Sequence, residues 1–155
     1  MASVREGGAM FKVIVWATDG SPTAERALPI ARWLAKSSGA RLVVAHVDEL
    51  VFGRSSGYHV HADEDALLAR IQESVDQLLQ DGVDTELKLA KVTTGGAAHV
   101  IDEIARDVGA DLIVAGTRGH GPVAGLLLGS VTHRLLHIAG CPVLTVPPAD
   151  ASSSS

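Results

Sequence analysis

Apolar residues along the chain follow two patterns, short nearly continuous runs and longer stretches with helical spacing. Four short runs have the length and composition of strands buried on both faces. They span residues 11–17, 42–47, 112–115 and 143–146. Residues 83–92 instead alternate apolar with charged side chains, which predicts a fifth strand with one wet face, at an edge of a sheet.

Four stretches with helical spacing separate these strands. They span residues 22–38, 63–81, 97–108 and 131–139. Ser21 and Pro22 are typical of an N-cap and a first helical residue, and Gly39 and Gly82 are expected to end the first two helices. The segment from Asp48 to Asp63 follows neither pattern and is expected to be an irregular loop.

Strands alternating with helices predict an α/β fold, a single doubly wound five-stranded parallel sheet with helices on both faces. Residues 83–92 alternate and residues 143–146 are short and lie between prolines, so both strands are expected at edges. Right-handed connections then give the order 3-2-1-4-5, counted along the chain. This order reverses between the first and fourth strands, where ligands bind in open α/β sheets. Asp19 and a glycine-rich loop follow these two strands and should meet there.

Composition limits the class of protein. The length of 155 residues suits one domain, which we place at residues 10–148, with a disordered arm at 1–9 and a disordered tail at 149–155. An apolar content of 46% is too high for disorder, and the apolar runs are too short to span a membrane. A net charge of −5 without a basic stripe argues against nucleic acid. The lack of an apolar leader and the single Cys141 lead us to expect a cytoplasmic protein.

The loop after the fourth strand predicts a phosphate-binding site. Its glycines allow backbone N–H groups to approach a ligand, and Ser130 opens a helix whose first N–H groups favour an anion. A flexible connection without a ligand is the alternative interpretation. Residues 119–124 also fit the dinucleotide pattern G-x-G-x-x-G/A, but Pro122 interrupts the loop and the segment follows the fourth strand rather than the first. No P-loop segment is present in the sequence.

The spacing Gly116-x2-Gly119-x9-Gly129-Ser130 resembles the signature G-2x-G-9x-G-[ST] of the ATP-binding branch of the universal stress protein family. The resemblance extends to three other segments. They are residues 17–21, 46–48 and 141–143. It implies an ATP site with Mg²⁺ held mainly through the phosphates, and a homodimer formed through the last strand.

The resemblance also implies a role for particular residues. Asp19 would grip ribose hydroxyls or a metal, Val47 would contact adenine, and Gly119 would leave room for the phosphates. Arg118 and His120 could approach phosphate oxygens, although the signature does not require them. With these two additions, the complete candidate set is Ala17, Thr18, Asp19, Val47, Ala115, Gly116, Arg118, Gly119, His120, Gly129, Ser130, Val131 and Thr132.

Other residues have simpler interpretations. Asp19 could merely cap a turn, and Thr132 could be a solvated residue of a first helical turn. The pairs His59-x-His61 and His133-x3-His137 lack the four ligands of a structural zinc site, so no metal site is predicted. Trp16 and Trp33 are expected in the core. Residues 63–65 read as an acidic first helical turn.

The function predicted from these observations is that of a nucleotide-occupied regulatory or stress-response module. No general base other than Asp19 is evident, so hydrolysis of ATP would be slow at most and no catalytic residue is assigned. An enzyme that uses ATP as a substrate on the same scaffold and a ligand-free partner-binding domain are the alternatives. The expected partners are an adenine nucleotide and a second copy of the chain, and neither nucleic acid nor a membrane.

Overall fold

The computed structural model describes residues 8–52, 57–59, 63–93, 95–117 and 128–149. The strands are β1 (Val13–Ala17), β2 (Arg41–Phe52), β3 (Gly57–His59), β4 (Thr85–Thr93), β5 (Leu112–Gly116) and β6 (Val143–Val146). The helices are α1 (Pro22–Ser38), α2 (Glu64–Gln80), α3 (Ala97–Asp107) and α4 (Ser130–Ile138).

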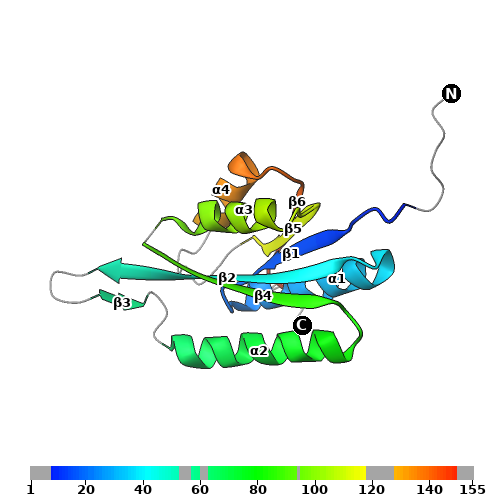
Figure 1. Cartoon of the computed structure of the whole chain (residues 1–155). Coiled ribbons are helices and arrows are strands. Elements are labelled where there is room, and N and C mark those ends of the chain that lie inside the picture. Colours follow the sequence, from blue (N-terminus) through cyan, green and yellow to red (C-terminus); the bar gives the residue numbers. More distant parts are fainter. Residues whose placement is uncertain (1–7, 53–56, 60–62, 94, 118–127, 150–155) are drawn as a thin grey trace, which may run out of the picture.

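Five parallel strands form one sheet in the order β4-β2-β1-β5-β6. Helices α1 and α2 cover one face and α3 and α4 cover the other, as Figure 1 shows. The predicted fold and strand order are therefore confirmed. Among the described residues, β4 pairs only with β2 and β6 only with β5, so both lie at edges as the sequence indicated.

The segment from Asp48 to Asp63 is not the irregular loop that we expected. Strand β2 continues to Phe52, and β3 turns back antiparallel to it, with Leu50 opposite His59. The extension was not predicted because the acidic residues Asp48 and Glu49 end the apolar run 42–47. Their backbones nevertheless continue the parallel ladder with β4, which runs beside β2 as far as Leu50. Because β4 occupies one side of Leu50, β3 must pair on the other side, beyond the end of β1.

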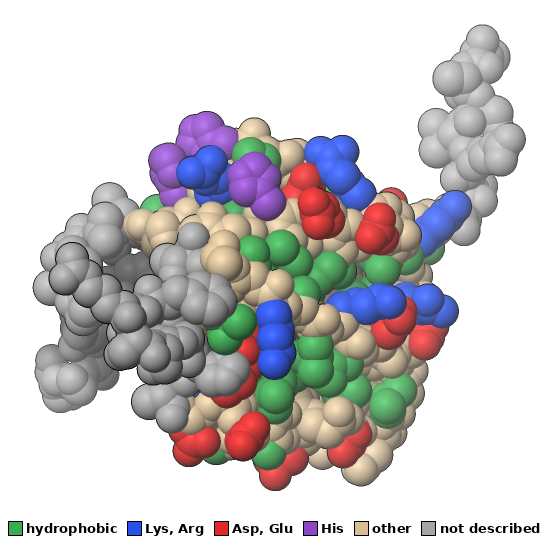
Figure 2. Space-filling model, turned by 60° about the vertical axis from the view of Figure 1, so that its left-hand side comes forward, with side chains coloured by type: hydrophobic (Ala, Val, Ile, Leu, Met, Phe, Trp, Pro, Cys, Tyr) green, Lys and Arg blue, Asp and Glu red, His purple; other side chains and the backbone are tan. Residues whose placement is uncertain are grey.

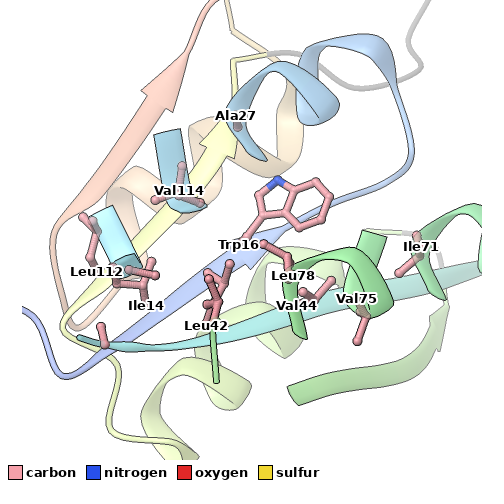
Figure 3. Close-up of a cluster of buried hydrophobic side chains, with 14 of the residues drawn as sticks. Ile14, Trp16, Ala27, Leu42, Val44, Ile71, Val75, Leu78, Leu112 and Val114 are labelled. Carbon is pink, nitrogen blue, oxygen red and sulfur yellow. The ribbon is translucent and has the colours of Figure 1, made fainter. Parts of the chain in front are cut away.

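Two apolar clusters fill the space on either side of the sheet. The cluster under α1 and α2 contains Trp16, which is fully buried and donates its indole N–H to the carbonyl of Ala24 at 3.0 Å. Figure 3 shows Trp16 beside Val44 of β2 and Leu78 of α2. The sequence-based placement of Trp33 in the core is wrong, because this side chain is 66% exposed. It projects from the side of α1 opposite the buried alanine stripe.

The ends of α1 follow the predicted chemistry. Ser21 accepts a hydrogen bond from the backbone N–H of Ala24 at 3.2 Å, Pro22 is the first helical residue, and Gly39 ends the helix with a φ of 70°. Left-handed φ values of this kind favour glycine because it has no Cβ. Among the helices within the described ranges, none is long and apolar enough to cross a membrane.

Candidate functional site

The candidate site lies where the sheet changes its winding direction. Strands β1 and β5 are neighbours, with Trp16 opposite Val114, and the chain continues from them to opposite sides, to β2 and to β6. Open α/β sheets bind ligands outside the carboxyl ends of the strands at such a point, so the ends of β1 and β5 border the expected site, which we call the crevice. The loop 18–21 and the start of α4 follow these two strand ends.

Loop 18–21 is ordered by its own side chains. The hydroxyl of Thr18 accepts from the N–H of Gly20 at 3.1 Å, and the Asp19 carboxylate accepts from the N–H of Ser21 at 2.9 Å. Gly20 has a φ of 72°, and an added Cβ would lie 1.8 Å from Cδ1 of Leu67 in α2. Asp19 thus caps this turn, the simpler role that the sequence left open, and it is held at the mouth of the crevice.

The end of β5 lies unusually close to α1. A Cβ on Gly116 would lie 2.8 Å from Cγ2 of Thr23 and 2.9 Å from its backbone carbonyl carbon. Gly116 is therefore required for packing between β5 and α1, whatever ligand the crevice holds. The hydroxyl of Thr132 donates to the carbonyl of Gly116 at 2.7 Å and fastens α4 to the same strand end.

The start of α4 faces the end of β5. The N–H of Gly129 donates to the carbonyl of Thr117 at 2.6 Å, and Gly129 is the N-cap of the helix without a side-chain cap bond. The first N–H groups of a helix have no partner within the helix and can bind an anion. Ser130 is exposed, whereas Thr132 is only 6% exposed and its proton is already donated. Arg118, Gly119 and His120 lie outside the described residues.

The remaining predicted residues share one face of the sheet. Ala17, Val47 and Ala115 belong to the cluster on the side of α3 and α4, and all three are buried. Ala97 and Ala98 at the start of α3 belong to the same cluster. The strand ends on this side therefore carry small side chains, which would leave space for a flat ring at the base of the crevice.

Sequence analysis missed a buried polar pair behind loop 18–21. Nδ1 of His46 lies 2.9 Å from the carbonyl oxygen of Thr18, and its Nε2 lies 2.7 Å from Oε1 of Glu64. His46 is 1% exposed and Glu64 is 9% exposed. The signal was a histidine inside the apolar run 42–47. In the acidic run 63–65, Asp63 is the N-cap of α2 and accepts a hydrogen bond from the N–H of Ala66, but the side chain of Glu64 is buried.

The histidines of α4 do not form a metal centre with their described neighbours. His133 and His137 are exposed, their ring centroids are 4.6 Å apart, and Nδ1 of His137 donates to the carbonyl of His133. Figure 2 shows histidine side chains gathered at one end of the molecule, where α3 and α4 lie. No group of three or more histidine, cysteine or acidic side chains could hold a metal within the part of the chain that the structure describes.

Shifted pKa values occur at the hydrogen-bonded contacts of Asp102 and Asp111. Burial raises the pKa of Asp102, but hydrogen bonds from Arg106 and Gly140 and the charge of Arg106 more than offset this effect and lower it. Backbone hydrogen bonds from Lys12 and Val13 lower the pKa of Asp111, at the amino end of β5.

The thiol of Cys141 lies near the Asp102 contact. Its pKa is raised by burial and then by the carboxylates of Asp102 and Asp111. A thiol with a raised pKa stays protonated at neutral pH and is a poor nucleophile. Cys141 therefore has a packing role, and it is partly buried beside the cluster under α3 and α4.

The sheet and its helix layers define an open doubly wound α/β protein whose topological switch point lies between β1 and β5. The family model for the universal stress protein family matches residues 10–147. A universal stress protein of Thermus aquaticus is 38% identical over 141 residues, which cover 88% of this chain and 99% of the relative. The chain belongs to the universal stress protein family.

Solved structures agree with this assignment. The structure of hypothetical protein MJ0577 superposes with a TM-score of 0.73 at 24% identity, over 92% of this chain and 99% of that one, and supports the fold. A universal stress protein in complex with cAMP has a TM-score of 0.61 at 29% identity, over 90% and 98% of the two chains. One from Archaeoglobus fulgidus in complex with dAMP has a TM-score of 0.60 at 26% identity, over 87% and 96%.

Proposed function

We propose that this protein binds ATP in the crevice between the ends of β1 and β5. It acts as a regulatory module of the stress response whose partner contacts depend on nucleotide occupancy. The observation that carries the proposal is the arrangement of the four signature positions. Gly116 ends β5, and Gly129 and Ser130 begin α4 beside it, so three of the four positions lie together; Gly119 lies outside the described residues. Family members bound to cAMP and to dAMP support an adenine nucleotide as the ligand.

The adenosine would lie on the α3–α4 side of the sheet. Ala17 and Ala115 offer small side chains there, and Val47, two residues beyond the partner of Ala17 in β2, would contact adenine. Asp19 would bind ribose hydroxyls while keeping its turn, because a carboxylate has several acceptor sites. Thr18 would contribute through the proton of its hydroxyl, because its backbone N–H already donates to the carbonyl of Ala45 and its carbonyl already accepts from His46.

The phosphates would lie against the start of α4. The N–H groups of residues 130–132 and the exposed hydroxyl of Ser130 would hold their oxygens, whereas the N–H of Gly129 already donates to the carbonyl of Thr117. Gly119 would leave room for them, and Arg118 and His120 would add charge or hydrogen bonds. Mg²⁺ would bind mainly to phosphate oxygens, because Mg²⁺ at nucleotide sites uses one or two carboxylates with substrate phosphates and water. Asp19 is the carboxylate available to it from loop 18–21.

The geometry of Asp19 supports slow hydrolysis of ATP at most. The Asp19 carboxylate accepts from the N–H of Ser21 and is oriented as a turn cap, not as a base aimed at a water molecule. An enzyme that uses ATP as its substrate is the second candidate. Turnover faster than about one per second would favour the enzyme, because that is the lower range of typical enzymes.

A homodimer through β6 is part of the proposal. Within the described residues, β6 pairs only with β5, so its outer edge offers backbone donors and acceptors to a second copy. Helix α1 lies near this edge, because Arg26 donates a 3.1 Å hydrogen bond to the carbonyl of Pro147, directly after β6. The apolar side chains of Ile30 and Trp33 are exposed on the same helix. Sedimentation of the purified chain over a range of concentrations tests this part separately.

The experiment for nucleotide binding combines a retained-ligand assay with titration. Protein purified from cells is heated, the released ligand is identified by chromatography, and the emptied protein is titrated with ATP by calorimetry. We expect an adenine nucleotide, and we expect Gly119→Leu to abolish binding without unfolding the chain. Gly121→Leu is the matched control, because Gly121 lies in the same loop outside the signature. Unchanged binding by Gly119→Leu would place the phosphates elsewhere.

A further inference from the structure

Loop 18–21 is supported from behind by a hydrogen-bonded chain that reaches α2. The chain runs from the carbonyl of Thr18 to Nδ1 of His46 at 2.9 Å, and from Nε2 of His46 to Oε1 of Glu64 at 2.7 Å. His46 lies in β2, and Glu64 is the first residue of α2. The pair is on the α1–α2 side of the sheet, because His46 lies on the same face of β2 as Leu42 and Val44 of the cluster on that side.

The proton positions in this chain follow from its acceptors. A carbonyl oxygen can only accept, so Nδ1 of His46 must carry a hydrogen and donate it to Thr18. The short contact between Nε2 and Glu64 then needs one further proton, held either by the imidazole or by the carboxyl group. In both cases the ring orientation is fixed, with one nitrogen committed to the loop and the other to α2.

A second contact joins α2 to the same loop. Gly20 lies against Leu67, one helical turn after Glu64, so closely that an added Cβ would come within 1.8 Å of the leucine side chain. Helix α2 therefore supports loop 18–21 at two points, through the Glu64–His46 hydrogen bond and through the packing of Leu67 against Gly20. Asp19 lies between the two supported residues, Thr18 and Gly20.

The inward orientation of Glu64 buries one carboxylate oxygen without a hydrogen-bond partner among the described residues, which is unfavourable in free energy. Oε2 of Glu64 is buried and has no hydrogen-bond partner among the described residues, although Glu64 could have turned outward as a first-turn residue. Leaving a buried acceptor unsatisfied is unfavourable, and such groups in folded proteins call for an explanation. Holding the crevice loop in one geometry is an explanation that uses the hydrogen bonds from His46 to Thr18 and to Glu64.

We propose that His46 and Glu64 are positioning residues that fix the carbonyl of Thr18 and thereby hold Asp19 in the orientation that the nucleotide requires. This inference rests on the proposed function. It adds that the start of α2, and with it the β2–β3 hairpin that precedes α2, is coupled to the crevice through one buried imidazole. A ligand that needs loop 18–21 in this geometry would stabilise the His46–Glu64 contact, and loss of that contact would weaken binding.

Four substitutions separate positioning from general stability. His46→Leu removes both hydrogen bonds, whereas His46→Asn keeps a side-chain N–H near the position of Nδ1 and can still donate to Thr18. Glu64→Gln keeps a hydrogen-bonding group opposite Nε2. Val75→Ala is the matched control, because Val75 is a buried residue of α2 that packs in the core and makes no contact with the pair.

We expect His46→Leu to raise the Kd for ATP by about tenfold, as loss of a supporting hydrogen bond does behind metal-binding side chains. His46→Asn and Glu64→Gln should stay within about threefold of the unsubstituted chain on the same scale. Val75→Ala should lower the melting temperature and leave the Kd unchanged. A Kd that is unchanged in folded His46→Leu, or that rises equally in Val75→Ala, would overturn the proposal.

A measurement without ligand keeps this inference apart from the proposed function. The amide protons of Gly20 and Ser21 hydrogen-bond within the loop, to Thr18 and to Asp19, so their hydrogen exchange reports on its order. We expect faster exchange at both amides in His46→Leu, but not in His46→Asn. Unchanged exchange would refute the positioning role. Absence of any nucleotide binding by the unsubstituted chain would instead refute the proposed function.

Discussion

Replacing Gly116 by alanine tests whether the first signature glycine is needed for packing. The new Cβ would lie 2.8, 2.9 and 3.0 Å from Cγ2 of Thr23, the carbonyl carbon of Thr23 and the backbone nitrogen of Ala24. Two of these three atoms belong to the backbone of α1 and cannot rotate away. Because carbon atoms prefer separations near 3.5 Å, α1 or β5 must move by roughly half an ångström.

The expected loss follows from two opposing effects. Overpacking of a core costs about 1–3 kcal/mol, and replacing glycine by alanine recovers about 0.4–1 kcal/mol through the lower entropy of the unfolded chain. The net loss of unfolding free energy should be about 1–2 kcal/mol. For a chain of this length it corresponds to a decrease of roughly 2–8 °C in melting temperature.

Urea unfolding followed by tryptophan fluorescence is a suitable assay, because Trp16 is fully buried in the cluster beneath α1. Gly8→Ala is the control, since its added Cβ would meet nothing within 4 Å. Adding Thr23→Ser removes only the Cγ2 contact, so it should restore part of the lost stability. A loss below about 0.5 kcal/mol, within the usual range of a surface change, would refute the packing argument. Full recovery by Thr23→Ser would refute the role of the helix backbone.

Two further predictions concern stability. Ser21→Ala removes the N-cap bond to Ala24 and should cost about 1 kcal/mol in urea unfolding; a change near zero would show that the cap is redundant. The lowered pKa values of Asp102 and Asp111 make both carboxylates stabilising above the unfolded-state pKa, about 3.9. That stability should be lost as the pH falls through the lower folded-state values. Asp102→Asn should therefore be less stable at pH 7 and should show a flatter decline below about pH 4, and parallel unfolding curves would contradict this.

The sequence predicted those parts of the fold that depend on side-chain patterns. The apolar run at Val143–Val146 matches β6, and Ser21 with Pro22 marks the start of α1. The extension of β2 through Asp48 could not be predicted from side chains, because backbone pairing with β4 determines how far β2 continues. Trp33 was misplaced because residue type favoured the core, whereas its position on α1 puts it outside.

The candidate site was only partly visible in the sequence. The glycine spacing indicated the crevice, but it did not reveal that Gly116 serves close packing against Thr23. The His46–Glu64 contact joins residues 18 positions apart across a hairpin, and no local pattern specifies such a pair. Histidine in an apolar run and glutamate in an acidic helix start each had a simpler local interpretation.

A crystal structure of the chain with ATP and Mg²⁺ at saturating concentration tests the central claim most directly. We predict adenine over Ala17 and Ala115, ribose at Asp19, and phosphates at the N–H groups that begin α4. Nucleotide bound at any other place, or a crevice filled by the chain's own side chains under these conditions, would contradict the account.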